Sequence, residues 1–165
     1  MKTRLTLFFI AVASFFVQAQ NTEACTETLS LMSTSVKAKD VTAYDYLTTL
    51  RKDCPSFHKS IYSLGEFAVK LKIEKATTPQ DKEKYVRDLL KLYDEHDQYF
   101  PNNGAGNKMK KGLALFENKI GTSDEVFQLL DVAFKTDYAN CKYAKAMYVY
   151  FEILVNNHKA NKGVE

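Results

Sequence analysis

The sequence predicts an all-α protein built from antiparallel helix pairs. Apolar residues recur along almost every segment with the 3.6-residue period of a helix, whereas strand-like alternation is scarce. The 165 residues contain three prolines and six glycines, and most of them lie between the periodic segments, where helices are interrupted. We therefore expect about seven helices and no sheet.

The chain begins with a segment that is typical of an export signal. Lys2 and Arg4 are basic, 5–17 is an almost unbroken apolar run, and Val17-Gln18-Ala19 places small residues where a signal peptidase reads. The run is shorter than the ~20 apolar residues of a membrane-spanning helix. We expect a cleaved signal peptide over 1–19; the alternative is an uncut N-terminal anchor.

The remaining chain is long enough for one helical domain, expected over 22–157 with a flexible tail at 158–165. Its charge is nearly balanced: the protein has 23 basic and 20 acidic residues, and loss of Lys2 and Arg4 lowers the formal net charge from +3 to +1. Nucleic-acid binders usually carry a basic face. The best candidate, at 108–111, is more typical of a solvated helix end, so we expect no nucleic-acid partner and no transmembrane segment in the mature chain.

Three helices are expected in the first half of the domain, over about 22–36, over about 42–52 and from about 56 onward. Cys54-Pro55-Ser56 separates the second from the third, because proline cannot continue a helix and disfavours helical geometry at the residue before it. The third helix carries an apolar stripe: Phe57, Ile61, Leu64, Ala68 and Leu71.

The fourth helix has the clearest N-terminal signal. Thr78 offers a capping hydroxyl, Pro79 suits the first helical position, and Asp81 places an acid in the first turn. The helix should end before Pro101. Its stripe is Tyr85, Leu89, Leu92, Tyr93, His96 and Phe100.

Three further helices follow. The fifth is expected over 107–119. The sixth begins at Thr122-Ser123-Asp124-Glu125, a capping box in which the Thr and Glu side chains accept each other's backbone N–H groups. The seventh is expected over 140–157, with an apolar side formed by Tyr143, Met147, Tyr150, Phe151 and Leu154.

The spacing of the helices indicates two-helix repeats. The predicted helix starts near 23 and 57, and near 106 and 140, are separated by about 34 residues, the period of tetratricopeptide (TPR) repeats. One hairpin cannot bury its apolar face alone, so neighbouring pairs stack. Ala43, Leu47, Leu50 and Pro55 have the spacing of a TPR second helix, and Leu89, Tyr93, His96 and Pro101 repeat it with His96 as a departure. The alternative is an irregular helical bundle.

Longer segments resemble a known group of proteins. A signal ending in QAQ, an early Cys, and the segments "KDCPSFHKSIYSLGEF", "KEKYVRDLLKLYDEHDQYF" and "GNKMKKGLALFENK" are similar to exported TPR-like proteins of the Bacteroidetes. The resemblance covers most of the mature chain. It implies a right-handed solenoid of stacked helix pairs and a location in the periplasm, at the cell surface or outside the cell, with no assigned activity. Because such proteins are generally longer, a truncated member is an alternative.

The three cysteines permit one disulfide and leave one thiol. The first two helices have similar lengths, so an antiparallel hairpin places Cys25 at the start of one beside Cys54 at the end of the other. We expect a structural Cys25–Cys54 bridge and a small core residue at Cys141. Unpaired thiols remain an alternative. So does a redox pair, although there is no Cys-x-x-Cys motif.

One local cluster, "DEHDQ" at 94–98, has the composition of a metal site. Asp94 and Asp97 share a helix face while Glu95 and His96 point elsewhere, so this helix alone cannot supply a closed ligand shell. We expect a solvated acidic helix end, with no metal, no cofactor and no catalytic residues. The alternative is a metal-dependent hydrolase that uses His96 and nearby acids.

Ten tyrosines and no tryptophan suggest a contact surface. Tyrosine in a groove offers a broad contact area and a hydrogen-bonding tip. We assign Tyr62, Tyr99 and Tyr148 to such a groove; the alternative is that the tyrosines line seams between repeats. The expected function is an exported TPR-like adaptor that binds a protein or peptide and is not an enzyme. A truncated fragment of a longer repeat protein is the other candidate.

Overall fold

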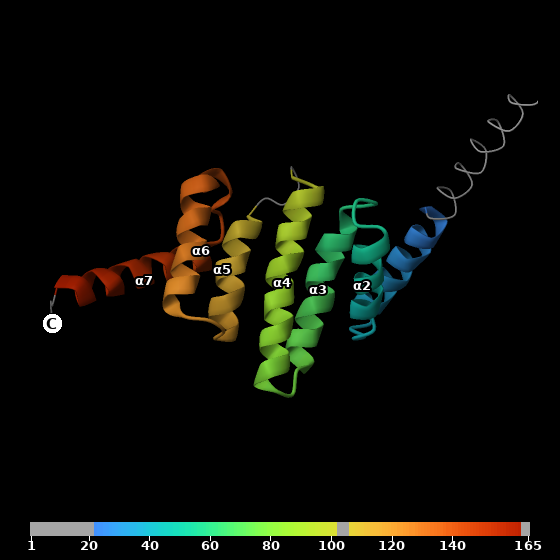
Figure 1. The fold of residues 1–165 in the computed structure, drawn as a ribbon, viewed down its shortest axis with the longest axis horizontal. Coiled ribbons are helices and arrows are strands. Elements are labelled where there is room, and N and C mark those ends of the chain that lie inside the picture. The colour runs from blue at the N-terminus through green and yellow to red at the C-terminus, as the bar shows by residue number, and fades with distance from the viewer. Residues whose placement is uncertain (1–21, 102–105, 163–165) are drawn as a thin grey trace, which may run out of the picture. The chain divides into compact units, whose positions relative to one another are not determined.

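The computed structural model describes residues 22–101 and 106–162, and this part of the chain forms seven α-helices and no strand (Figure 1). This confirms the predicted all-α class. The described residues divide into an N-terminal unit that ends at Ala68 and a C-terminal unit that begins at Val69, so the division falls within α3 (Ser60–Lys75). The predicted signal peptide lies outside the described residues. No helix in the described ranges is long and apolar enough to cross a membrane.

The N-terminal unit contains a helix over 22–37, α2 (Ala43–Asp53) and the first part of α3. On α2, Ala43, Leu47 and Leu50 are completely buried. These are the residues whose spacing resembles a TPR second helix, so their side chains do form the core-facing side of α2. The helix ends at Cys54, whose backbone N–H donates to the Leu50 carbonyl.

The third helix begins at Ser60, four residues later than the start predicted from the sequence. The segment before it forms a turn, in which the Phe57 N–H donates to the Cys54 carbonyl. His58 then accepts the Ser60 N–H through Nδ1 at 3.1 Å. Because an imidazole takes the place of the usual Ser, Thr, Asp or Asn cap, the sequence pattern gives little warning of this boundary.

The C-terminal unit is organised around α5 (Asn107–Asn118), which packs most extensively on α6 (Ser123–Thr136) and next on α4 (Pro79–Tyr99). Figure 1 shows these three helices side by side. The predicted start of α4 is confirmed: Thr78 Oγ1 accepts the Asp81 N–H at 3.0 Å, and Pro79 is the first helical residue. The close contact of α5 with α6 requires a glycine at 112, because a Cβ there would lie 2.7 Å from the Leu130 side chain.

The last helix, α7 (Ala144–Lys162), begins after a short 3-10 turn (Tyr138–Asn140) and contacts α5 and α6. Its predicted start at 140 is therefore wrong by four residues. The helix also continues through 158–162, which the sequence predicts to be a flexible tail. Over 144–159, α7 buries Ala146, Val149, Tyr150 and Ile153.

The predicted apolar side of the seventh helix is wrong in part. Tyr150 is buried and stacks on Phe127 and Phe134, with ring centroids 5.4 and 5.3 Å apart. Phe151 and Leu154, which were expected beside it, are 46% and 40% exposed. The helix therefore has apolar residues on two faces, of which one packs on α5 and α6.

Candidate functional site

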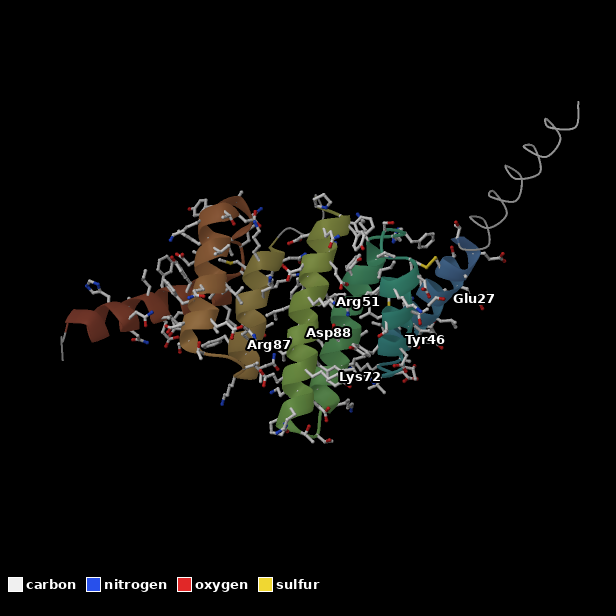
Figure 2. The ribbon with its side chains drawn as sticks, in the orientation of Figure 1. Glu27, Tyr46, Arg51, Lys72, Arg87 and Asp88 are labelled. Carbon is white, nitrogen blue, oxygen red and sulfur yellow. A yellow bond between two sulfur atoms is a disulfide. The ribbon has the colours of Figure 1, made fainter. Side chains whose placement is uncertain are left out.

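The two cysteines predicted to pair form a disulfide. Cys25 lies in the first turn of the helix over 22–37, Cys54 caps α2, and their Cα atoms are 6.0 Å apart. Figure 2 shows the bond in yellow between these two helices. The bond ties the beginning of one helix to the end of the next, as the hairpin geometry predicts.

Cys141 is a free thiol that lies before α7, not within it. Its Sγ donates weakly to the carbonyls of Asp137 at 3.5 Å and Ala133 at 3.6 Å. Burial, together with the Asp137 carboxylate, raises the pKa of the thiol. A raised pKa lowers the fraction of thiolate, which is the nucleophilic form of cysteine.

The three tyrosines assigned to a groove differ in burial and belong to different units. Tyr62 is 2% exposed, and its hydroxyl donates to the Pro55 carbonyl at 3.0 Å, so it is a core residue of the N-terminal unit. Tyr99 ends α4 and Tyr148 lies on α7; both are exposed, and neither is among the residues that line the two grooves of the C-terminal unit described below. The assignment of Tyr62 to a binding surface is therefore wrong.

The acidic cluster at the end of α4 joins α4 to α5. Asn107, which is almost fully buried, places its Nδ2 3.2 Å from His96 Nδ1 and donates to Asp97 Oδ1 at 2.8 Å. Burial raises the pKa of Asp97, and the bond from Asn107 opposes that rise. His96 and Asp97 thus share an interhelical contact. Among the described residues there is no group of His, Cys, Asp and Glu side chains arranged to hold a metal.

The three lysines near the start of α5 do not form a common basic face. Lys108 donates to Thr136 Oγ1 at 3.1 Å, and Lys110 lies over the rings of Tyr93 and Tyr143. Lys111 pairs with Asp94 at 2.6 Å. Each lysine has its own contact within the C-terminal unit.

The best candidate for a binding site is a groove of about 500 Å³ in the C-terminal unit. Its size falls within the range of ligand pockets in proteins. It runs between α4 and α6, and α5 contributes Lys111. We call it the α4–α6 groove; it is lined by Arg87, Leu90, Lys91, Asp94, Lys111, Glu125, Gln128, Leu129 and Val132.

The lining residues of α4 and α6 follow the same helical spacing. Positions 87, 90, 91 and 94 on α4, and 125, 128, 129 and 132 on α6, are related as i, i+3, i+4 and i+7. Residues so spaced lie on one face of a helix. Each helix therefore contributes one stripe, which combines apolar and charged side chains. The apolar members are Leu90, Leu129 and Val132, of which Val132 is 52% exposed.

An ion pair joins the two walls of the groove. Both guanidinium nitrogens of Arg87 donate to the Glu125 carboxylate, and the Nη2–Oε2 distance is 3.1 Å. Figure 2 shows Arg87 on α4. The guanidinium holds the pKa of Glu125 below its usual value, and the carboxylate in turn raises the pKa of Arg87. The groove is thus bridged by a charge pair whose two members can also bind a ligand.

This ion pair corrects the predicted capping box at the start of α6. Thr122 Oγ1 accepts the Glu125 N–H at 3.1 Å, as predicted. The Glu125 carboxylate, however, binds Arg87 of α4. A second ion pair, Lys111–Asp94, joins α5 to α4 further along the groove.

Two other concave surfaces are less suited to specific binding. One, of about 750 Å³, is lined among the described residues by a single face of the helix over 22–37. The other, of about 410 Å³, lies where the turn between α5 and α6 meets α7 and includes Phe116, Val126 and Ile153. Neither has an ion pair across it comparable to that between Arg87 and Glu125 among the contacts of the described residues.

The groove residues were not predicted from the sequence. The predictions concerned tyrosines and metal ligands, whereas the groove is made of charged and aliphatic side chains. The sequence did contain one signal of the groove: α4 and α6, which are separated by α5, each carry the lining residues with the same i, i+3, i+4, i+7 spacing. A comparison with protein-family models, with curated proteins and with solved structures found no match to this chain.

Proposed function

We propose that this chain is an exported TPR-like adaptor that binds a protein or peptide in the α4–α6 groove, in the periplasm or at the cell surface. One observation carries the proposal: two helices present matched stripes of apolar and charged side chains on opposite sides of a groove of about 500 Å³. Apolar side chains with a few well-placed polar groups are what peptide-binding grooves offer.

Further features support a binding role. A disulfide is typical of proteins that fold in an oxidising compartment, which agrees with the predicted export signal. The all-helical fold agrees with stacked helix pairs. Among the side chains considered for chemistry, His96 and Asp97 contact Asn107 of the neighbouring helix. The pKa of the Cys141 thiol is raised.

The charges of the groove suggest the composition of its ligand. Arg87, Lys91 and Lys111 are basic, and Asp94 and Glu125 are acidic. A ligand that places an apolar side chain against Leu129 and Val132 and charged groups of both signs beside it complements these walls. A strongly basic segment would be repelled by Arg87, Lys91 and Lys111, and a strongly acidic segment by Asp94 and Glu125, so neither complements the groove.

The proposal is tested with a fluorescein-labelled short peptide selected from a displayed random library against the purified protein. We expect Val132→Glu to weaken binding about tenfold or more, because a carboxylate then replaces an apolar contact in the groove. Phe67→Glu is the control, since Phe67 is 59% exposed, close to the 52% of Val132, but belongs to α3. Binding is measured by fluorescence anisotropy. If Val132→Glu weakens the binding of none of the selected peptides, and Phe67→Glu weakens the binding of all of them, the groove is not the binding site.

A further inference from the structure

The exposed face of α7 has a regular apolar pattern. Tyr148, Phe151 and Val155 are 66%, 46% and 49% exposed. Together with the exposed residues Ala144 and His158, they are separated by alternating steps of four and three residues. This is the heptad spacing of the seam along which two helices pair in a coiled coil. We call Ala144, Tyr148, Phe151, Val155 and His158 the α7 seam.

The seam lies on a different side of α7 from the residues that the helix buries within its own unit, although the Phe151 ring also contacts Phe134 of α6 edge-on, with ring centroids 6.2 Å apart. Those buried residues are Ala146, Val149, Tyr150 and Ile153, each at most 8% exposed. A helix that is apolar around most of its circumference is usually covered on all of its apolar sides. Contiguous exposed apolar side chains on a folded protein mark interaction surfaces. The seam therefore has the features of a surface that another helix covers.

The side chains that flank the seam indicate which helix this is. Lys145, Glu152 and Lys159 follow one side of it, seven residues apart and alternating in charge, and Met147 and Leu154 follow the other side. In an antiparallel coiled coil, each flanking row meets the same row of the partner helix. A row of alternating charge can pair with the same row of a second copy, because each cation can lie opposite an anion. A row of apolar side chains can likewise pack on the same row of a second copy.

One register satisfies all of these positions. If Tyr148 of one α7 lies opposite Phe151 of a second, antiparallel α7, then Ala144 lies opposite Val155 and Met147 opposite Leu154. Lys145 then lies opposite Glu152 of the second copy, and twofold symmetry makes this contact twice. In a parallel pair the two unlike rows would meet, so Glu152 would face Met147 or Leu154 and have no cation opposite it.

We propose that the α7 seam is a homodimer interface, in which α7 pairs with the antiparallel α7 of a second copy of this chain. Lys145 is able to bond Glu152 of the second copy while it keeps its contact within its own chain. It bonds Glu117 at 2.6 Å, but its side chain is 60% exposed and an ammonium group has three donors. The proposed interface uses none of the residues that line the α4–α6 groove and does not depend on peptide binding.

The dimer should be reversible. Two helices that pair over about three turns bury an interface at the small end of the range for specific complexes. We therefore expect a dissociation constant in the micromolar range. The mature chain, from Gln20 onward, should change from monomer to dimer as its concentration rises through that range, as measured by sedimentation equilibrium. Cys141→Ser is used as the background, so that an intermolecular disulfide cannot imitate the dimer.

The first test removes the apolar contacts. Tyr148→Glu should abolish the dimer, because it places two carboxylates opposite the Phe151 rings. Tyr138→Glu is the matched control: Tyr138 is also a highly exposed tyrosine, but it precedes α7 and lies outside the seam. A wild-type chain that stays monomeric at high concentration, or a dimer that Tyr148→Glu leaves unchanged, overturns the proposal.

The second test addresses the register. Lys145→Glu and Glu152→Lys should each weaken self-association about tenfold, because each turns two attractive contacts into repulsive ones. Mixing the two variants should restore a dimer. The carboxylate introduced at position 145 of one chain then faces the ammonium introduced at position 152 of the other, while the unchanged Glu152 of the first chain faces the unchanged Lys145 of the second. Circular dichroism checks that both variants are folded. A mixture that associates no better than the separate variants contradicts the antiparallel register.

Discussion

At the scale of single residues, Gly112 determines how closely α5 and α6 approach. A Cβ at this position would lie 2.7 Å from both Cγ and Cδ2 of Leu130 and 3.4 Å from the Val126 carbonyl oxygen. Glycine inside a helix costs about 1 kcal/mol relative to alanine. This cost in helix propensity allows α5 and α6 to form the most extensive helix contact in the C-terminal unit.

The substitution Gly112→Ala should therefore destabilise the protein although it improves helix propensity. Overpacking of a core typically costs about 1–3 kcal/mol, which exceeds the propensity gain of about 1 kcal/mol. We expect a net loss of up to about 2 kcal/mol in the free energy of unfolding, measured by urea denaturation followed by circular dichroism. The double variant Gly112→Ala, Leu130→Ala should show coupling, because removing the leucine side chain removes the clash. A Gly112→Ala variant more stable than the wild type would show that α6 moves away without cost.

Glycine is also required at 121, beside the groove ion pair. Gly121 has a φ of +76°, in the left-handed region that favours glycine. A Cβ there would lie 2.2 Å from Glu125 Oε2. The turn between α5 and α6 therefore leaves space for the Glu125 carboxylate to reach Arg87.

The Arg87–Glu125 pair should make stability depend on pH. Because the pKa of Glu125 is lowered in the folded state, its contribution is fully present above the usual value of 4.5 and is lost as the pH falls through the folded pKa. We expect Glu125→Gln to cost about 0.5–1 kcal/mol at neutral pH, as for an ion pair whose side chains are 39% and 36% exposed and therefore screened by solvent. The difference from the wild type should shrink at acid pH.

The matched control for this prediction is Glu83→Gln. Glu83 also pairs with Arg87, but at 3.6 Å and from a more exposed position. Its replacement should change the free energy of unfolding at neutral pH less than Glu125→Gln does. Urea unfolding at neutral pH and near pH ~4 measures both effects. A Glu125→Gln difference that stays constant over this range would mean that the ion pair contributes nothing.

At the scale of elements, the disulfide holds together the first two helices of the N-terminal unit. Its two cysteines are 29 positions apart in the sequence. The helix over 22–37 buries Cys25 and Met32, and most of its other side chains are partly or fully exposed. A helix that buries so few side chains gains little from packing, so the covalent link matters more here than it would in a large core.

Replacing both cysteines, Cys25→Ser with Cys54→Ser, should lower the free energy of unfolding by roughly 3–4 kcal/mol in the chain-entropy model. Hydrogen exchange should localise the loss to the helix over 22–37. The control is Cys141→Ser, which leaves the bridge intact and should be close to neutral. The prediction fails if peptide mapping without reductant finds Cys25 and Cys54 both alkylated.

At the scale of the whole molecule, the sequence predicts what local physics determines. The period of apolar residues and the caps at helix ends depend on neighbours within one or two turns, so the all-helical class and the start of α4 at Thr78-Pro79 could be predicted. The burial of Ala43, Leu47 and Leu50 agrees with their repeat-like spacing. The disulfide followed from the lengths of two adjacent helices.

What could not be predicted depends on residues distant in the sequence. Glu125 binds Arg87, 38 positions away, instead of completing a capping box. Asn107 of α5 contacts His96 and Asp97 of α4, so part of the acidic cluster lies in a contact between helices, whereas Asp94 is 61% exposed. Tyrosine composition gave no indication that Tyr62 is buried. The groove, too, exists because α4 and α6 lie on either side of α5.

The position of Cys141 has a consequence for oxidative folding of the whole chain. A chain with three cysteines has three ways to form one bridge, and wrong bridges are made and unmade by thiolate attack. Cys141 sits against the carbonyl end of α6, and both its burial and the Asp137 carboxylate raise its pKa. Because only the thiolate attacks a disulfide, we expect that Cys141 exchanges with the Cys25–Cys54 bond more slowly once the C-terminal helices have folded.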